Sequence, residues 1–156
     1  MSLFSLLSFL HKIFPAQSVF AHCDIPCGIY TVEPAKTAAM TVVKMVENLY
    51  AQILPADDAD RREWLEFENI LARCIMVKEE HAQKCKEELL ILWTDYFKLE
   101  HLAIFPTLHE TFWKAAKLCS QVKQEVNMEA AKALQDAVEN IGEMFAKVEA
   151  VKRAHG

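Results

Sequence analysis

Apolar residues recur three and four positions apart along this chain, and that spacing constrains the fold more than any other feature. The clearest stripe lies near the C-terminus: Ala131, Leu134, Val138, Ile141, Phe145 and Val148. Residues spaced in this way share one face of an α-helix. The 156-residue chain has only 3 glycines and 5 prolines, which disfavours a turn-rich β fold. We therefore expect a single all-α domain with one core.

Three earlier segments show the same helical spacing. The first follows Pro34 and stops at Pro55, with these apolar positions: Val42, Val43, Val46, Leu49, Tyr50 and Ile53. The second begins at Asp57 and Asp58, which favour a helix N-terminus, and its buried stripe is Trp64, Phe67, Leu71 and Cys74. Its helical pattern continues toward Phe97, so we expect a kink or break within residues 80–100.

The third segment opens at Pro106 and turns four residues inward: Leu108, Phe112, Ala115 and Cys119. With the C-terminal stripe, these segments predict an antiparallel four-helix bundle. Cys74, Cys85 and Cys119 have no metal-ligand spacing, so we interpret them as small apolar residues on helix faces.

The segment His22-Cys23-Asp24-Ile25-Pro26-Cys27 concentrates metal-binding groups. If the chain is cut after Ala21, His22 offers an α-amine and an imidazole, and Cys23 offers a backbone nitrogen and a thiolate. A second thiolate comes from Cys27. Pro26 fixes φ and folds the segment back, and Gly28 permits a positive φ where the segment leaves the metal.

This donor set favours a square-planar metal with one axial ligand. Square-planar nitrogen ligation indicates Ni(II) or Cu(II), whereas thiolates argue against magnesium and calcium. A structural zinc site would close a tetrahedron with four side chains, and this segment supplies only three.

Two separated motifs resemble the nickel-containing superoxide dismutases. The first is the nickel hook, residues 22–30, which runs His-Cys-Asp-Ile-Pro-Cys-Gly-Ile-Tyr and is close to the family pattern H-C-D-x-P-C-G-x-Y. The second is Leu-Trp-Thr-Asp-Tyr-Phe-Lys at 92–98, which is similar to L-W-x-D-Y-F-K. The resemblance implies dismutation of superoxide to dioxygen and hydrogen peroxide by Ni(II)/Ni(III) cycling. It also implies a homohexamer and a removable leader.

The resemblance assigns roles to residues in both motifs. His22, Cys23 and Cys27 are the expected nickel ligands, and Tyr30 and Tyr96 are expected near the open face of the site. Outside the ligand set, the expected supporting residues are Asp24, which braces the hook, Pro26, Gly28, Lys98 and His81. Lys98 is the candidate cation for attracting superoxide.

One feature departs from the family pattern. In the family, a glutamate and an arginine support the axial imidazole, and these positions fall on Met40 and His81 here. This chain therefore needs another group to hold the His22 imidazole, such as His81 itself or Glu79.

Residues 1–21 form a separate segment. The run from Leu3 to Leu10 is apolar apart from two serines and is too short to span a bilayer. Two small residues, Val19 and Ala21, precede the possible cut. We expect a pro-segment removed in the cytoplasm by a protease that cuts after Ala21, with an export signal as the alternative. The mature chain, 22–156, then carries the hook and the bundle, with no membrane segment.

Two other functions use the same residues. A nickel or copper binding module without turnover would have no need of Tyr30 and Tyr96. A secreted helical-bundle interaction protein would pair Cys23 with Cys27 in a disulfide. The formal net charge of −5 gives no indication of nucleic-acid binding.

Overall fold

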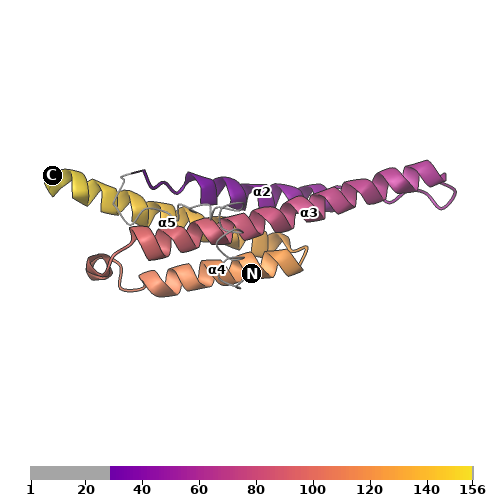
Figure 1. Cartoon of the computed structure of the whole chain (residues 1–156). Coiled ribbons are helices and arrows are strands. Elements are labelled where there is room, and N and C mark those ends of the chain that lie inside the picture. Colours follow the sequence, from indigo (N-terminus) through magenta and orange to yellow (C-terminus); the bar gives the residue numbers. More distant parts are fainter. Residues whose placement is uncertain (1–28, 156) are drawn as a thin grey trace, which may run out of the picture.

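The computed structural model describes residues 29–155, which form four long helices connected in sequence (Figure 1). They are α2 (Glu33–Tyr50), α3 (Arg61–Ile91), α4 (Leu108–Gln124) and α5 (Met128–His155). Each packs against its neighbours in the chain, and α2 also packs against α5, which closes the ring. This arrangement confirms the predicted four-helix bundle, and the described residues contain no strand.

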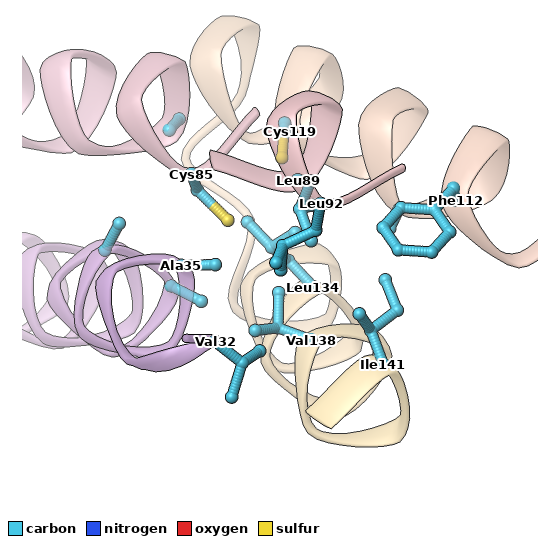
Figure 2. Close-up of a cluster of buried hydrophobic side chains, with 14 of the residues drawn as sticks. Val32, Ala35, Cys85, Leu89, Leu92, Phe112, Cys119, Leu134, Val138 and Ile141 are labelled. Atoms are coloured by element: carbon cyan, nitrogen blue, oxygen red, sulfur yellow. The ribbon is translucent and has the colours of Figure 1, made fainter. Parts of the chain in front are cut away.

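All four helices contribute to one core (Figure 2). The α5 stripe is buried as predicted, apart from Phe145, which is half-buried and packs against the core. The four inward positions predicted on α4 are also buried. Cys74, Cys85 and Cys119 are buried free thiols, which confirms their interpretation as small apolar residues.

The boundary between α2 and α3 differs from the prediction. Helix α2 ends at Tyr50, before Pro55, and Ile53 is therefore 87% exposed in the connection. Helix α3 begins later than predicted because Asp60 is its N-cap. The Asp60 carboxylate accepts hydrogen bonds from the backbone N–H groups of Arg62 at 2.8 Å and Glu63 at 2.9 Å. The predicted start at Asp57 and Asp58 is wrong.

The predicted buried stripe at the start of α3 is also partly wrong. Trp64 is exposed, and Phe67 and Leu71 are only half-buried, whereas Cys74 is buried. The Tyr50 hydroxyl donates a hydrogen bond to the Val126 carbonyl in the α4–α5 connection, 3.0 Å away. The first turns of α3 therefore extend past the end of the bundle, where no other helix covers them (Figure 1).

The predicted break in the long helix is confirmed at the end of α3. Residues Leu92–Tyr96 form a single π-helical turn, η1, in which the Phe97 N–H donates to the Leu92 carbonyl at 3.0 Å. A short 3₁₀ helix, η2 (Leu99–Ala103), follows. The wider turn places Leu92 and Tyr96 in the core. Such π turns are frequent at functional sites.

Candidate metal centre

Tyr30 and Tyr96, the two tyrosines predicted near the site, lie together. Tyr30 precedes α2 and Tyr96 ends η1, yet their ring centroids are 5.9 Å apart in an edge-on arrangement. Tyr30 is only three positions after Cys27. Tyr30, the last residue of the predicted hook, therefore lies directly beside Tyr96.

Tyr96 is held firmly in this position. Its ring is 5% exposed and stacks on Phe145 with a centroid distance of 4.3 Å. Its hydroxyl donates a hydrogen bond to Glu149 Oε1 on α5, 2.6 Å away. Burial and this carboxylate raise the pKa of Tyr96 far above that of a free tyrosine. The phenol is therefore neutral at physiological pH.

A lysine on α5 completes this cluster. Lys152 Nζ lies 3.0 Å from Glu149 Oε1 and 4.2 Å from the centroid of the Tyr96 ring. The hydrogen bond from Tyr96 and the contact with Lys152 lower the pKa of Glu149. The carboxylate is thus ionised, and its Oε1 atom accepts hydrogen bonds from both the phenol and the ammonium group.

Lys98 is exposed and lies at the start of η2, two residues after Tyr96. Its backbone N–H donates to Nδ1 of His101, 3.0 Å away, which leaves the imidazole proton on Nε2. His101 is buried, and burial lowers its pKa. The neutral His101 therefore fixes the backbone of the segment that presents Lys98.

His81, on α3, lies beside the first residues of α2. It lines a pocket of about 330 Å³ together with Thr31, Glu33 and Pro34 at the start of α2 and with Lys84. The His81 Nδ1 atom is buried and has no hydrogen-bond partner among the described residues. A buried ring nitrogen without a partner is costly, so this atom is suited to a partner from outside the described residues.

Met40, which aligns with the other supporting position, does not line the pocket that contains His81. It is exposed and lines a different groove, with Lys44 and Gln135. The structure thus brings only one of the two aligned residues to the pocket beside Thr31.

The sequence did not single out Glu149, Lys152 or His101. Glu149 and Lys152 are three positions apart and read as an ordinary surface ion pair of a helix. Their roles depend on contact with Tyr96, which comes from a different helix. No local signal in the sequence reports such a contact.

The comparisons with known proteins agree with both motifs. A family model described as nickel-containing superoxide dismutase matches residues 17–149. The superoxide dismutase [Ni] of Streptomyces seoulensis is 32% identical over 137 residues, which is 87% of this chain and 95% of the relative. This chain belongs to the nickel-containing superoxide dismutase family.

Further members of the family agree in sequence and in fold. The superoxide dismutase [Ni] of Streptomyces coelicolor is 28% identical over the same share of each chain. A crystal structure of a Ni-containing superoxide dismutase, with its nickel ligation in the oxidized state, superposes with a TM-score of 0.68 at 30% identity. It covers 82% of this chain and 98% of its own. The bundle is thus the fold of the nickel superoxide dismutases.

The predicted nickel ligands, His22, Cys23 and Cys27, lie outside the described residues, as do Asp24, Pro26 and Gly28. Within residues 29–155 no group of three His, Cys, Asp or Glu side chains is arranged to hold a metal ion. The remaining cysteines are buried in the core. The assignment of the nickel ligands to His22, Cys23 and Cys27 therefore stays a prediction from the sequence.

Proposed function

We propose that this chain dismutates superoxide, 2 O₂⁻ + 2 H⁺ → O₂ + H₂O₂, with a nickel ion held by His22, Cys23 and Cys27. The enzyme class and the metal follow from membership of the nickel superoxide dismutase family. The ligand assignment is supported by the chemistry of the segment, which combines two thiolates, a backbone nitrogen and the groups of His22. This donor set fits nickel better than zinc, calcium or magnesium.

When bound, nickel supplies the one-electron exchange with superoxide by alternating between Ni(II) and Ni(III). The thiolates of Cys23 and Cys27 are electron-rich donors that stabilise the higher oxidation state. His22 contributes its α-amine only after the chain is cut on its N-terminal side. Processing after Ala21 would therefore be a chemical requirement of the site.

In this proposal, Tyr30 and Tyr96 limit access to the open face of the hook. Support comes from the contact between the two rings and from the short distance in sequence between Tyr30 and Cys27. Because Tyr96 is buried and neutral, it can hold a water or peroxide molecule without repelling an anion. Two aromatic rings at the mouth would also restrict larger anions.

His81 is the best candidate for supporting the imidazole of His22. The support is its buried Nδ1 atom, which has no partner among the described residues, and its pocket beside Thr31. A hydrogen bond between the two imidazoles would fix the tautomer and orientation of the His22 ring. This chain would then use a histidine where the family pattern has an acid–base pair.

Lys98 is proposed to attract superoxide. The whole chain has a formal net charge of −5, so an anionic substrate needs a local positive charge near the site. Lys98 is exposed, and its backbone is held by the bond to His101, close to Tyr96.

The mature enzyme is proposed to be a cytoplasmic homohexamer that forms after a protease removes residues 1–21. The exposed apolar residues at the free end of the α2–α3 hairpin support self-association, and they include Ile53, Leu54 and Leu65. No helix among the described residues is both long and apolar enough to cross a membrane.

The proposal is tested by adding one alanine before His22 in otherwise processed protein. The extra residue converts the α-amine into an amide and removes one nitrogen donor from the site. We expect loss of nickel binding at stoichiometric metal and loss of superoxide dismutation, with an unchanged circular dichroism spectrum. Full activity in the extended protein would refute the proposed ligand set.

A further inference from the structure

We propose that Glu149 is a positioning residue for Tyr96, fixing the direction in which the phenol donates its proton. This inference rests on the proposed function, because it assigns Tyr96 to the mouth of the nickel site. It extends that function by linking the C-terminal helix to the site.

The hydrogen bond to Glu149 limits how the Tyr96 hydroxyl can bind any other partner. A phenol has one proton to donate, and Tyr96 donates it to Glu149 Oε1 at 2.6 Å. The Tyr96 oxygen then has only lone pairs to offer to any other partner. A water, a peroxide or a neighbouring hydroxyl must therefore act as the donor toward Tyr96.

The charges around Tyr96 favour this arrangement. Lys152 on α5 lies 3.0 Å from the Glu149 carboxylate and stands over the Tyr96 ring. His101 on η2 and Tyr30 are the other titratable groups whose rings face Tyr96. Among these groups only Glu149 carries a negative charge at neutral pH, and it is also the acceptor for the phenol.

A purely structural role would not need the carboxylate. The Tyr96 ring is already held by stacking on Phe145 and by an edge-on contact with Phe97 at 5.0 Å. Burial raises the pKa of the Tyr96 phenol, and the Glu149 carboxylate raises that pKa further and fixes the direction of the hydroxyl proton, which ring packing does not do. Without that charge, the phenol could ionise at lower pH and would then repel superoxide.

The first test uses Glu149→Gln, which keeps the shape and removes the charge. The processed, metal-free protein is titrated by the ultraviolet absorbance of tyrosinate, and Tyr96→Phe identifies the contribution of Tyr96. We expect the Tyr96 midpoint to fall by at least about one pH unit in Glu149→Gln. The matched control is Glu143→Gln, an exposed glutamate on the same helix, which should leave the midpoint unchanged.

The second test is the pH profile of superoxide dismutation by the nickel-loaded enzyme. The alkaline loss of activity should begin at lower pH in Glu149→Gln than in the wild type, and Glu149→Asp should restore part of the difference. An unchanged tyrosine titration, or an unchanged pH profile in an active Glu149→Gln enzyme, would overturn the role of Glu149 but leave the proposed function intact. A nickel-loaded wild type without activity would refute the proposed function itself.

Discussion

Lys78 gives the sharpest prediction for stability, because its charge is buried at a helix end. The side chain is 1% exposed and comes from α3, but its ammonium group donates hydrogen bonds to three carbonyls at the C-terminus of α4. The acceptors are Val122, Lys123 at 3.0 Å and Glu125 at 3.1 Å. These carbonyls have no partner within the helix and carry the negative end of its dipole. Lys78 therefore caps α4 from a neighbouring helix.

Lys78→Met keeps most of the side-chain volume and removes the cap. The Val122 carbonyl would be left buried without a donor, at a cost of about 1–3 kcal/mol. Loss of the charge at a partly buried helix end adds up to about 2 kcal/mol. Relief from burying the ammonium group offsets part of this cost. We expect the free energy of unfolding to fall by about 2–4 kcal/mol.

The measurement is urea unfolding of the processed, metal-free protein at fixed protein concentration, since oligomers unfold in a concentration-dependent way. The matched control is Lys86→Met on the same helix, which loses a single bond to the Ser120 hydroxyl at 3.1 Å. That control should cost less than about 1 kcal/mol. A Lys78→Met protein as stable as the control would refute the capping argument.

The same residue predicts a pH dependence. Burial lowers the pKa of Lys78 below its ordinary value of 10.5. Between the folded and unfolded pKa values the unfolded chain binds more protons, so the stability of the wild type should rise with pH in that window. The gap between wild type and Lys78→Met should therefore widen as the pH increases toward 10.5. A gap that narrows would contradict the direction of the shift.

Three further substitutions test other parts of the structure. Phe112→Ala should lower the free energy of unfolding by about 3–5 kcal/mol in urea titrations, because the buried Phe112 ring stacks on Trp93. A loss of less than about 1 kcal/mol would contradict this packing. Gly142→Ala should be neutral or raise the melting temperature, since helix propensity improves by up to about 1 kcal/mol. The new Cβ would make an ordinary contact with Val32, and its close contacts are with the flexible end of Lys36, so a marked fall would mean that Lys36 cannot move. His81→Ala should change the electron paramagnetic resonance spectrum of the nickel-loaded enzyme, and an unchanged spectrum would remove His81 from the site. The free energy of unfolding should change by less than about 1 kcal/mol, because the buried His81 nitrogen loses no partner among the described residues.

The helices were predictable wherever a stripe faces the core along its whole length. Helix α5 is the best case, because Leu134, Val138 and Ile141 are all fully buried by the other three helices. The break near residue 92 was also predictable, since an unbroken helix to Phe97 would be too long for a small bundle. In both places, the structure expected from local periodicity and from the size of the domain is the structure observed.

The end of the α2–α3 hairpin was not predictable from local pattern. Trp64 and Ile53 have helical spacing, but burial requires a partner, and the bundle ends near the contact of Tyr50 with Val126. Likewise, the cap could have formed at any of three nearby aspartates, and only the structure assigns it to Asp60. Which residues are buried at the end of the hairpin, and where α3 begins, depends on where the other helices end.

The candidate site, like the fold, was only partly predictable from the sequence. The hook residues and Tyr96 could be found from the sequence because they fall in short motifs with unusual chemistry. Glu149 and Lys152 could not, because their importance comes from contacts with a residue on another element. The Nδ1 atom of His81 became informative only when the structure left it buried without a partner among the described residues.

The most direct test of the account is nickel analysis of protein processed after Ala21, combined with electron paramagnetic resonance and a superoxide decay assay. We predict one nickel ion per chain, a Ni(III) spectrum with nitrogen hyperfine splitting from the axial His22 imidazole, and rapid decay of superoxide. Tetrahedral zinc in the hook, or nickel-loaded protein that leaves superoxide untouched, would contradict the assignment of His22, Cys23 and Cys27 as the redox site.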